Sequence, residues 1–149
     1  MPLLRKRLAF LVSHMFQQEP TQTSLRIALS EVWVFPTEKL AMAQLAALGS
    51  KRVPKCGVPV VRKAFGPKFK GLRIRMHRIQ SAVAGGVGWR ITELSESGLL
   101  RRQFIDLFAF ARGRVVVALS TTSFPDLFPQ ALGRQLMTLL VTRASPPGP

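Results

Sequence analysis

The middle of the sequence holds a run of positive charge that no acidic residue interrupts. Between Glu38 and Glu93 lie twelve basic residues: Lys39, Lys51, Arg52, Lys55, Arg62, Lys63, Lys68, Lys70, Arg73, Arg75, Arg78 and Arg90. The whole chain of 149 residues has 22 Lys and Arg against seven Asp and Glu, a formal net charge of +15. Seven acids cannot neutralise these cations, so the field of the protein attracts polyanions. The chemistry that this pattern indicates is anion binding, with RNA as the favoured partner.

Aromatic side chains lie within the same basic run. Phe65 and Phe69 alternate with lysines in a Gly- and Pro-rich stretch, as in proteins that stack single-stranded bases beside a basic groove. Arg73 and Arg75 project from one face of a predicted strand, roughly 6.6 Å apart, which is close to the spacing of backbone phosphates. The predicted anion-binding residues are Lys51, Arg52, Lys55, Arg62, Lys63, Phe65, Lys68, Phe69, Lys70, Arg73, Arg75 and Arg78. The alternative is a solvated basic face that keeps the protein soluble.

The residues that catalysis requires are few. Glu93, Glu96 and Asp106 form one group of acids around a predicted turn, where surface salt bridges are expected rather than general acid–base chemistry. We therefore expect a protein that is not an enzyme.

The single cysteine gives no stronger signal. Cys56 follows Lys55, which can lower the pKa of a thiol, but a nucleophile also needs a base, and the histidines are His14 and His77. Two histidines and one cysteine lack metal-ligand spacing, so we expect no metal and no cofactor. One thiol forms no internal disulfide, which favours an intracellular location while leaving an extracytoplasmic one open.

The basic residues must be positioned by the elements around them, and the clearest of these is a strand over residues 72–79. Its side chains alternate, with Leu72, Ile74 and Met76 facing one way and Arg73, Arg75 and His77 the other. A second strand is expected in GWRITELSE, with Trp89, Ile91 and Glu93 on one side. Residues 50–71 read as an irregular basic connection with one short strand near residues 58–61.

Two further elements precede the basic run. Residues 25–35 have strand composition, and Pro36 ends that strand. Thr37 is a good N-cap for a helix over EKLAMAQLAAL, which buries Leu40, Leu45 and Leu48 and ends at Gly49.

The C-terminal half has one ambiguous segment. Residues 99–111 match helical spacing, but the Arg112–Gly113 pair before RVVVALS favours a β-hairpin in which Phe110 faces Val115 and Asp106 faces Leu119. A last helix is expected from Ser123, with Pro129 as an alternative start and an apolar stripe of Leu132, Leu136, Leu139 and Leu140.

The first 18 residues allow three interpretations. The favoured one is an amphipathic helix packed on the core, with Leu4, Leu8, Leu11, Val12 and Met15 on one face. The others are a degenerate secretory signal and an organelle presequence, since Arg5–Arg7 precede an apolar run. Residues 17–24 are expected to form a loop.

The expected fold class is α+β, a single domain with a mainly antiparallel sheet and two or three helices packed on it. The domain would span residues 25–143, after the segment 1–18 and before a disordered tail, 144–149. No stretch is apolar enough for a transmembrane helix.

Two segments resemble small extracytoplasmic sensor-like lipoproteins of high-GC bacteria. They are RIALSEVWVF with EKLAMAQLAAL, within residues 25–49, and FAFARGRVVVALSTTSF with PQALGRQL, within residues 104–143. The resemblance implies an antiparallel sheet with helices on one face and carries over no catalytic residues.

Three functions follow from these observations. The first is a non-enzymatic basic module that binds a polyanion, RNA above all, as part of a larger assembly. The second is an extracytoplasmic sensor-like or ligand-binding domain. The third is a peripheral protein of anionic membranes.

Overall fold

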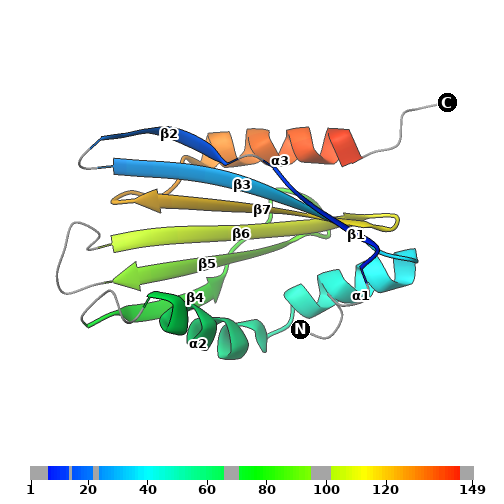
Figure 1. Cartoon of the computed structure of the whole chain (residues 1–149), viewed down its shortest axis with the longest axis horizontal. Helices are drawn as coiled ribbons and strands as arrows, with labels where there is room; N and C mark the ends of the chain where they lie inside the picture. The colour runs from blue at the N-terminus through cyan, green and yellow to red at the C-terminus, as the bar shows by residue number, and fades with distance from the viewer. Residues whose placement is uncertain (1–6, 14, 22–23, 66–70, 95–101, 145–149) are drawn as a thin grey trace.

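One antiparallel β-sheet organises the chain (Figure 1). The computed structural model describes residues 7–13, 15–21, 24–65, 71–94 and 102–144. Within them, the strands are β1 (Ala9–Val12), β2 (Phe16–Thr21), β3 (Ser24–Val34), β4 (Arg73–Arg78), β5 (Val87–Leu94), β6 (Arg102–Arg112) and β7 (Val115–Phe124). The helices are α1 (Glu38–Leu48), α2 (Val53–Phe65) and α3 (Gln130–Ala144). This confirms the expected α+β single domain.

The strands lie in the order β1-β3-β7-β6-β5-β4, and β2 pairs with the other end of β3. The long strands β3, β7 and β6 therefore form the centre of the sheet, while β4 is one edge and β1 with β2 the other. The basic strand β4 consequently has one free edge, and cations on an edge strand discourage pairing with another chain.

Helices cover both faces of the sheet, which corrects the expectation of helices on one face. Successive strand residues point to opposite faces, and the neighbours Val116 and Val117 belong to different cores. One core, on the α1 side, contains Trp33, Phe35, Ala41, Leu45, Val87, Ala109 and Val116. The other, on the α3 side, contains Ala28, Phe110, Val117, Leu119, Phe128 and Met137. The two tryptophans are buried, as their strand context indicates.

Helix α1 follows the sequence prediction. The hydroxyl of Thr37 accepts a hydrogen bond from the backbone N–H of Leu40 at 3.2 Å. Glu38 lies in the first turn, where its negative charge interacts favourably with the positive end of the helix dipole. The inward side chains are Ala41, Gln44 and Leu45, while Leu40 and Leu48 are partly buried against the same core. Gly49 ends the helix.

The irregular connection predicted over residues 50–71 is wrong for residues 53–65, which form α2. Pro54 lies in the first turn, where no intrahelical N–H bond is lost. Val53, Gly57 and Val61 recur every four residues on the half-buried side of the helix, so a one-sided helix outweighs the Gly and Pro signals. A Cβ on Gly57 would lie 3.2 Å from the sulfur of Met76, which shows how closely α2 approaches β4.

The N-terminal helix predicted within residues 1–18 is also wrong where the structure describes it, and the loop predicted for residues 17–24 is replaced by β2 and the start of β3. Short apolar runs fit either periodicity, and the open edge of β3 decides between them. The N–H of Leu8 donates to the Val34 carbonyl at 2.7 Å, and that of Ser13 donates to the Ser30 carbonyl at 2.9 Å. The targeting alternatives for this segment stay untested.

The hairpin preferred for the ambiguous segment is confirmed, but its register differs by two residues. Phe110 pairs with Val117 and Asp106 with Thr121, because the two-residue turn is Gly113–Arg114 rather than Arg112–Gly113. Gly113 has a φ of 51°, which the first central position of such a turn requires and which glycine tolerates best. An even shift leaves every side chain on its predicted face.

The last helix begins at Gln130, so Pro129 and not Ser123 marks its start. Ser123 is buried in β7, where it pairs with Arg26 and Phe104. Of the predicted apolar stripe, Leu136 and Leu140 pack on the core, whereas Leu132 and Leu139 are exposed and Met137 is the buried residue.

Candidate functional site

A row of polar side chains crosses four neighbouring strands on the α3 face of the sheet. In register, His77 of β4 lies opposite Arg90 of β5, Arg90 opposite Asp106 of β6, and Asp106 opposite Thr121 of β7. Directly opposite residues share a face, so all four side chains leave the sheet on one side. Helix α3 packs on β7, and no described helix packs to a similar extent on the part of this face over β4 and β5.

An ion pair occupies the centre of the row. The Arg90 Nε donates to Asp106 Oδ1 at 2.6 Å, and its Nη2 donates to Oδ2 at 2.7 Å, which is the fork geometry that guanidinium and carboxylate prefer. The side chains of Arg90 and Asp106 are 21% and 6% exposed. The hydrogen bond to Asp106 raises the pKa of Arg90 above its ordinary value, so the guanidinium stays charged.

Two buried hydroxyl groups lie beside this pair on β7. Thr121 and Ser123 are each 1% exposed, and neither hydroxyl has a hydrogen-bond partner among the residues that the structure describes. A buried hydroxyl without a partner is unfavourable, and sites of this kind are often completed by a ligand or an ordered water.

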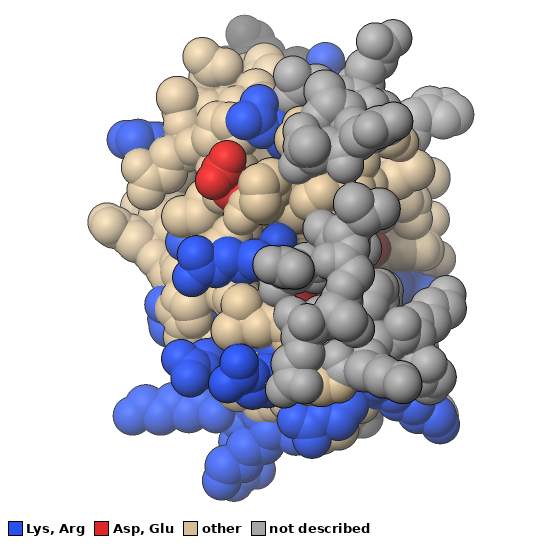
Figure 2. Space-filling model, turned by 90° about the vertical axis from the view of Figure 1, so that its left-hand side faces the viewer, with Lys and Arg blue, Asp and Glu red and all other residues tan. Residues whose placement is uncertain are grey.

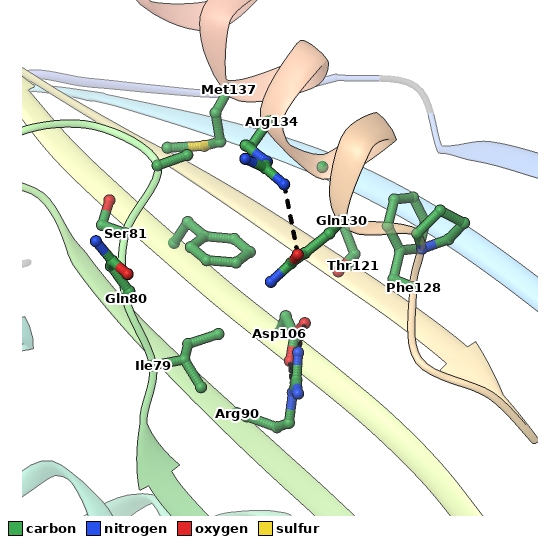
Figure 3. A pocket seen from close by; sticks show the side chains of 14 residues that line it. Ile79, Gln80, Ser81, Arg90, Asp106, Thr121, Phe128, Gln130, Arg134 and Met137 are labelled. Carbon is green, nitrogen blue, oxygen red and sulfur yellow. Dashed lines mark hydrogen bonds and ion pairs between the residues drawn. The ribbon is translucent and has the colours of Figure 1, made fainter.

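A cavity of about 550 Å³ opens above Thr121, between α3 and the strands (Figure 3). The Arg90–Asp106 pair lines one side, and Gln130 and Arg134 reach in from the first turns of α3, joined by a hydrogen bond of 3.4 Å. The remaining lining is Ile79, Gln80, Ser81, Ala82, Phe108, Phe128, Pro129, Gly133 and Met137. The described lining of the cavity is therefore a mixture of polar and apolar side chains, with Phe108, Phe128 and Met137 as its largest apolar members.

A second, more open hollow of about 670 Å³ borders the first, and Arg90 lines both. Its lining is Arg75, His77, Arg90, Thr92, Leu94, Arg102, Phe104, Pro125, Asp126 and Leu127. The Arg102 guanidinium lies 5.4 Å from the centre of the Phe104 ring, which holds the cation beside an apolar surface. We call the two hollows together the α3-side cleft, with an inner cavity and an outer groove.

The α3-side cleft carries an excess of positive charge. Its described lining contains four arginines, Arg75, Arg90, Arg102 and Arg134, against the two acids Asp106 and Asp126. Asp106 is already paired with Arg90, and within the described part of the chain Arg75, Arg102 and Arg134 form no ion pair, so their guanidinium groups can contact an anion. Aromatic and aliphatic side chains lie between these cations, so the cleft suits a molecule with an acidic group and an apolar body.

The structure divides the anion site that the sequence predicts. Arg73 and Arg75 are exposed on the α3 face of β4, and Arg75 lines the outer groove. Lys51 and Arg52 lie between α1 and α2, and Lys55, Arg62 and Lys63 are exposed on α2, which packs on the other face of β4. Lysines and arginines gather in the lower part of Figure 2, the part that holds α2 and β4 in Figure 1. Lys68, Phe69, Lys70 and the Phe65 side chain lie outside the described residues.

Arg78 makes two contacts that hold elements of the fold together. Its Nη1 donates to the Gly49 carbonyl at 2.6 Å, and its guanidinium lies 5.3 Å from the centre of the Trp89 ring. The Trp89 Nε1 in turn donates to the Leu48 carbonyl at 2.7 Å. These contacts fasten β4 and β5 to the end of α1, and the place of Arg78 in the anion site stays a prediction.

The residues considered for catalysis do not converge. Glu93 is buried on the α1 face and Asp106 on the α3 face, so the expected surface acids are two separate buried groups, and Glu96 lies outside the described residues. Burial raises the pKa of Glu93 above its ordinary value. Cys56 is exposed. Among the described residues, no three His, Cys, Asp or Glu side chains are grouped as a metal site would need, and no helix is long and apolar enough to cross a membrane.

Most of the cleft has no distinctive signal in the sequence. Arg90, Arg102 and Arg134 lie on three separate elements, and Thr121 resembles any strand threonine. One signal was present, because Arg90 and Thr92 alternate with the inward Trp89 and Ile91 and so belong to the same face as Arg73 and Arg75.

Comparison with known proteins gives distant likenesses. No family model and no curated protein matches the sequence. The extracellular domain of PknH from Mycobacterium tuberculosis is 10% identical with a TM-score of 0.49, over 95% of this chain and 87% of that one. LpqN, involved in cell envelope biogenesis of Mycobacterium tuberculosis, is 8% identical with a TM-score of 0.35, over 91% and 79%. Mll3558 from Rhizobium loti is 12% identical with a TM-score of 0.27, over 91% and 96%.

One of these three structures is an extracellular domain. Likenesses this distant carry no conclusion about what this chain binds, and its extracytoplasmic location stays a prediction.

Proposed function

We propose that the chain is a non-enzymatic binding domain that holds a small amphiphilic anion in the α3-side cleft. The observation that carries the proposal is the inner cavity above Thr121, whose buried hydroxyl lacks a partner beside the arginines that line the same hollow. A ligand that brings a hydrogen-bonding group would satisfy this hydroxyl and remove an unfavourable feature of the empty protein.

The charges and the apolar lining specify the class of ligand. Arg75 and Arg102 in the outer groove attract a carboxylate, phosphate or sulfonate group, for which guanidinium is the best-suited side chain. Phe104 and Leu127 in the groove and Phe108 and Phe128 in the cavity would bury the apolar body of the same molecule.

The arrangement favours binding over catalysis. Asp106, the carboxylate of the inner cavity, is held in two hydrogen bonds to Arg90 and is not available as a base. His77 lines the outer groove from the exposed side of β4, with none of the described lining residues placed beside it as a nucleophile. We therefore assign no reaction to the cleft.

The experiment uses anilinonaphthalene sulfonate, an aromatic sulfonate, as the probe and measures its affinity by fluorescence. The test variant is Arg75→Gln/Arg102→Gln, and the control, Arg62→Gln/Lys63→Gln, removes two exposed cations from α2. Loss of the charge-assisted contacts should weaken binding at least about tenfold in the test variant and leave the control near wild type. Equal affinity in the two variants would overturn the proposal.

A second candidate is the polyanion-binding surface expected from the sequence. It is favoured by the exposed cations of α2, none of which forms an ion pair among the described residues. The same two variants separate the candidates when a single-stranded RNA oligonucleotide replaces the probe. Weaker RNA binding with a shallower salt dependence in the α2 variant alone would favour this surface over the cleft.

A further inference from the structure

The N-terminal edge of the sheet exposes six large apolar side chains that lie close together in sequence. Among the described residues of this segment they are 39–67% exposed: Leu8, Phe10, Leu11, Val12, Met15 and Phe16. Scattered exposed apolar residues are normal on a protein surface, but a contiguous apolar patch marks a surface that another body covers. We call these six residues the apolar edge.

The apolar edge presents its side chains to both faces of the sheet. β1 and β2 both pair with β3 on the side away from β7, and their other side forms the outer edge. Phe10 lies opposite Trp33 and Val12 opposite Glu31, whereas Leu11 lies opposite Val32, so neighbouring side chains point to opposite faces. A partner that buries all of these side chains must therefore surround the edge rather than pack on one face.

This geometry discriminates between the partners that could bury the apolar edge. A helix or a rigid partner surface packed on one face would leave Phe10 and Val12, or Leu11, in water. A second copy joined edge to edge would extend the sheet and leave the apolar side chains of both faces exposed. The interfacial region of a lipid bilayer is fluid, so it can close around a shallowly inserted edge on every side.

The charge of the chain selects the lipid. Residues 7–16 contain no Asp or Glu, and Arg7 is stacked on Phe10 with its guanidinium 4.2 Å from the ring centre. The whole chain carries a net charge of +15, which repels a second copy and attracts an anionic surface. We propose that the apolar edge inserts into the interfacial region of an anionic lipid bilayer. This inference does not depend on the cleft.

Vesicle co-sedimentation tests the proposal with the full chain. The wild type should bind vesicles containing phosphatidylglycerol and bind pure phosphatidylcholine vesicles much more weakly. Leu11→Ser/Phe16→Ser removes two side chains that are 66% and 67% exposed, and should reduce binding to the anionic vesicles at least about tenfold. The control Val60→Ser/Leu139→Ser removes side chains that are 68% and 53% exposed on α2 and α3, and should bind like the wild type.

Two results would overturn the proposal. If Leu11→Ser/Phe16→Ser binds anionic vesicles as tightly as the wild type, attraction between charges alone explains the binding. If the wild type is a dimer in analytical ultracentrifugation and the same variant is a monomer with unchanged vesicle binding, the edge belongs to a second copy. Should that variant fail to fold, Leu8→Ser/Met15→Ser repeats the test outside the strands.

Discussion

Arg90 and Asp106 face each other on β5 and β6 and share two hydrogen bonds of 2.6 and 2.7 Å beneath the α3-side cleft. The pair places the charge of Asp106 where it is neutralised, so the buried carboxylate does not repel an anion that enters the cleft. It also ties two neighbouring strands together at the place where α3 does not cover them. The Arg90–Asp106 ion pair therefore stabilises the sheet and also lines the candidate site.

Removing one partner of this ion pair should lower the free energy of unfolding more than removing both partners. Asp106→Leu leaves the Arg90 guanidinium partly buried without its partner and should reduce the free energy of unfolding by about 3 kcal/mol. The double variant Arg90→Met/Asp106→Leu removes both charges and should recover most of that loss, because neither desolvated charge remains. Urea unfolding of both variants measures the difference. A double variant no more stable than Asp106→Leu would contradict this interpretation.

Loss of the Thr121 hydroxyl should raise the stability of the unliganded protein and lower its affinity for the ligand. Thr121→Val replaces a buried hydroxyl without a partner by a methyl group, so the unliganded protein should gain about 1 kcal/mol in free energy of unfolding. The same change should weaken binding of the sulfonate probe if the ligand uses this hydroxyl. Thr122→Val, on the opposite face of β7, is the matched control and should affect neither quantity by more than about 0.5 kcal/mol. A loss of stability in Thr121→Val would argue for a partner that the hydroxyl already has.

Glu93 should make stability depend on pH. The carboxyl lies between Ile74 and Gln103 on the α1 face, and burial raises its pKa above the ordinary value of 4.5. The folded protein then binds this proton more tightly than the unfolded chain, so the contribution is complete below pH 4.5 and is lost as pH rises through the folded pKa.

The measurement compares wild type with Glu93→Gln, whose side chain does not titrate. In urea unfolding from pH 4 to pH 7.5, the wild type should lose stability relative to Glu93→Gln as pH rises. The two curves should run parallel below about pH 4.5, where both side chains are neutral. A difference that stays constant up to neutral pH would show that Glu93 is solvated.

Local patterns in the sequence suffice for the elements that depend on their own residues. Strand β4 follows from the alternation of Ile74 and Met76 with Arg73 and Arg75, and α1 follows from Thr37 and the Leu and Ala spacing behind it. The buried positions of Trp89 and Ile91 on β5 follow from the same period of two. In these cases the burial of one face and the local preference agree.

The elements that the sequence does not predict depend on distant partners. The N-terminal residues form strands because the open edge of β3 offers hydrogen bonds, although their spacing fits a helix equally well. Helix α2 contains Pro59 and Gly57, which indicate a break, yet its half-buried side packs on β4. Tertiary contacts override local propensity in both places.

The candidate site is harder to predict from the sequence than these elements, because its floor depends on how β5, β6 and β7 are aligned. Arg90, Asp106 and Thr121 are far apart in sequence and meet only when β5, β6 and β7 pair as they do. In the predicted hairpin Asp106 faces Leu119, so the row with Thr121 does not form. Arg134 completes the cavity from α3, whose packing on β7 no local pattern specifies.

The turn that sets this register gives the last prediction. Gly113 has a φ of 51°, and a Cβ at this position would meet nothing within 4 Å, so a substitution there strains the backbone without a steric clash. Gly113→Ala should lower the free energy of unfolding by about 1 kcal/mol, and Gly113→Asn by less, because asparagine tolerates positive φ better than alanine. Urea unfolding ranks the three proteins. Equal losses for alanine and asparagine would show that the turn, and with it the register that aligns Asp106 with Thr121, does not rely on positive φ at residue 113.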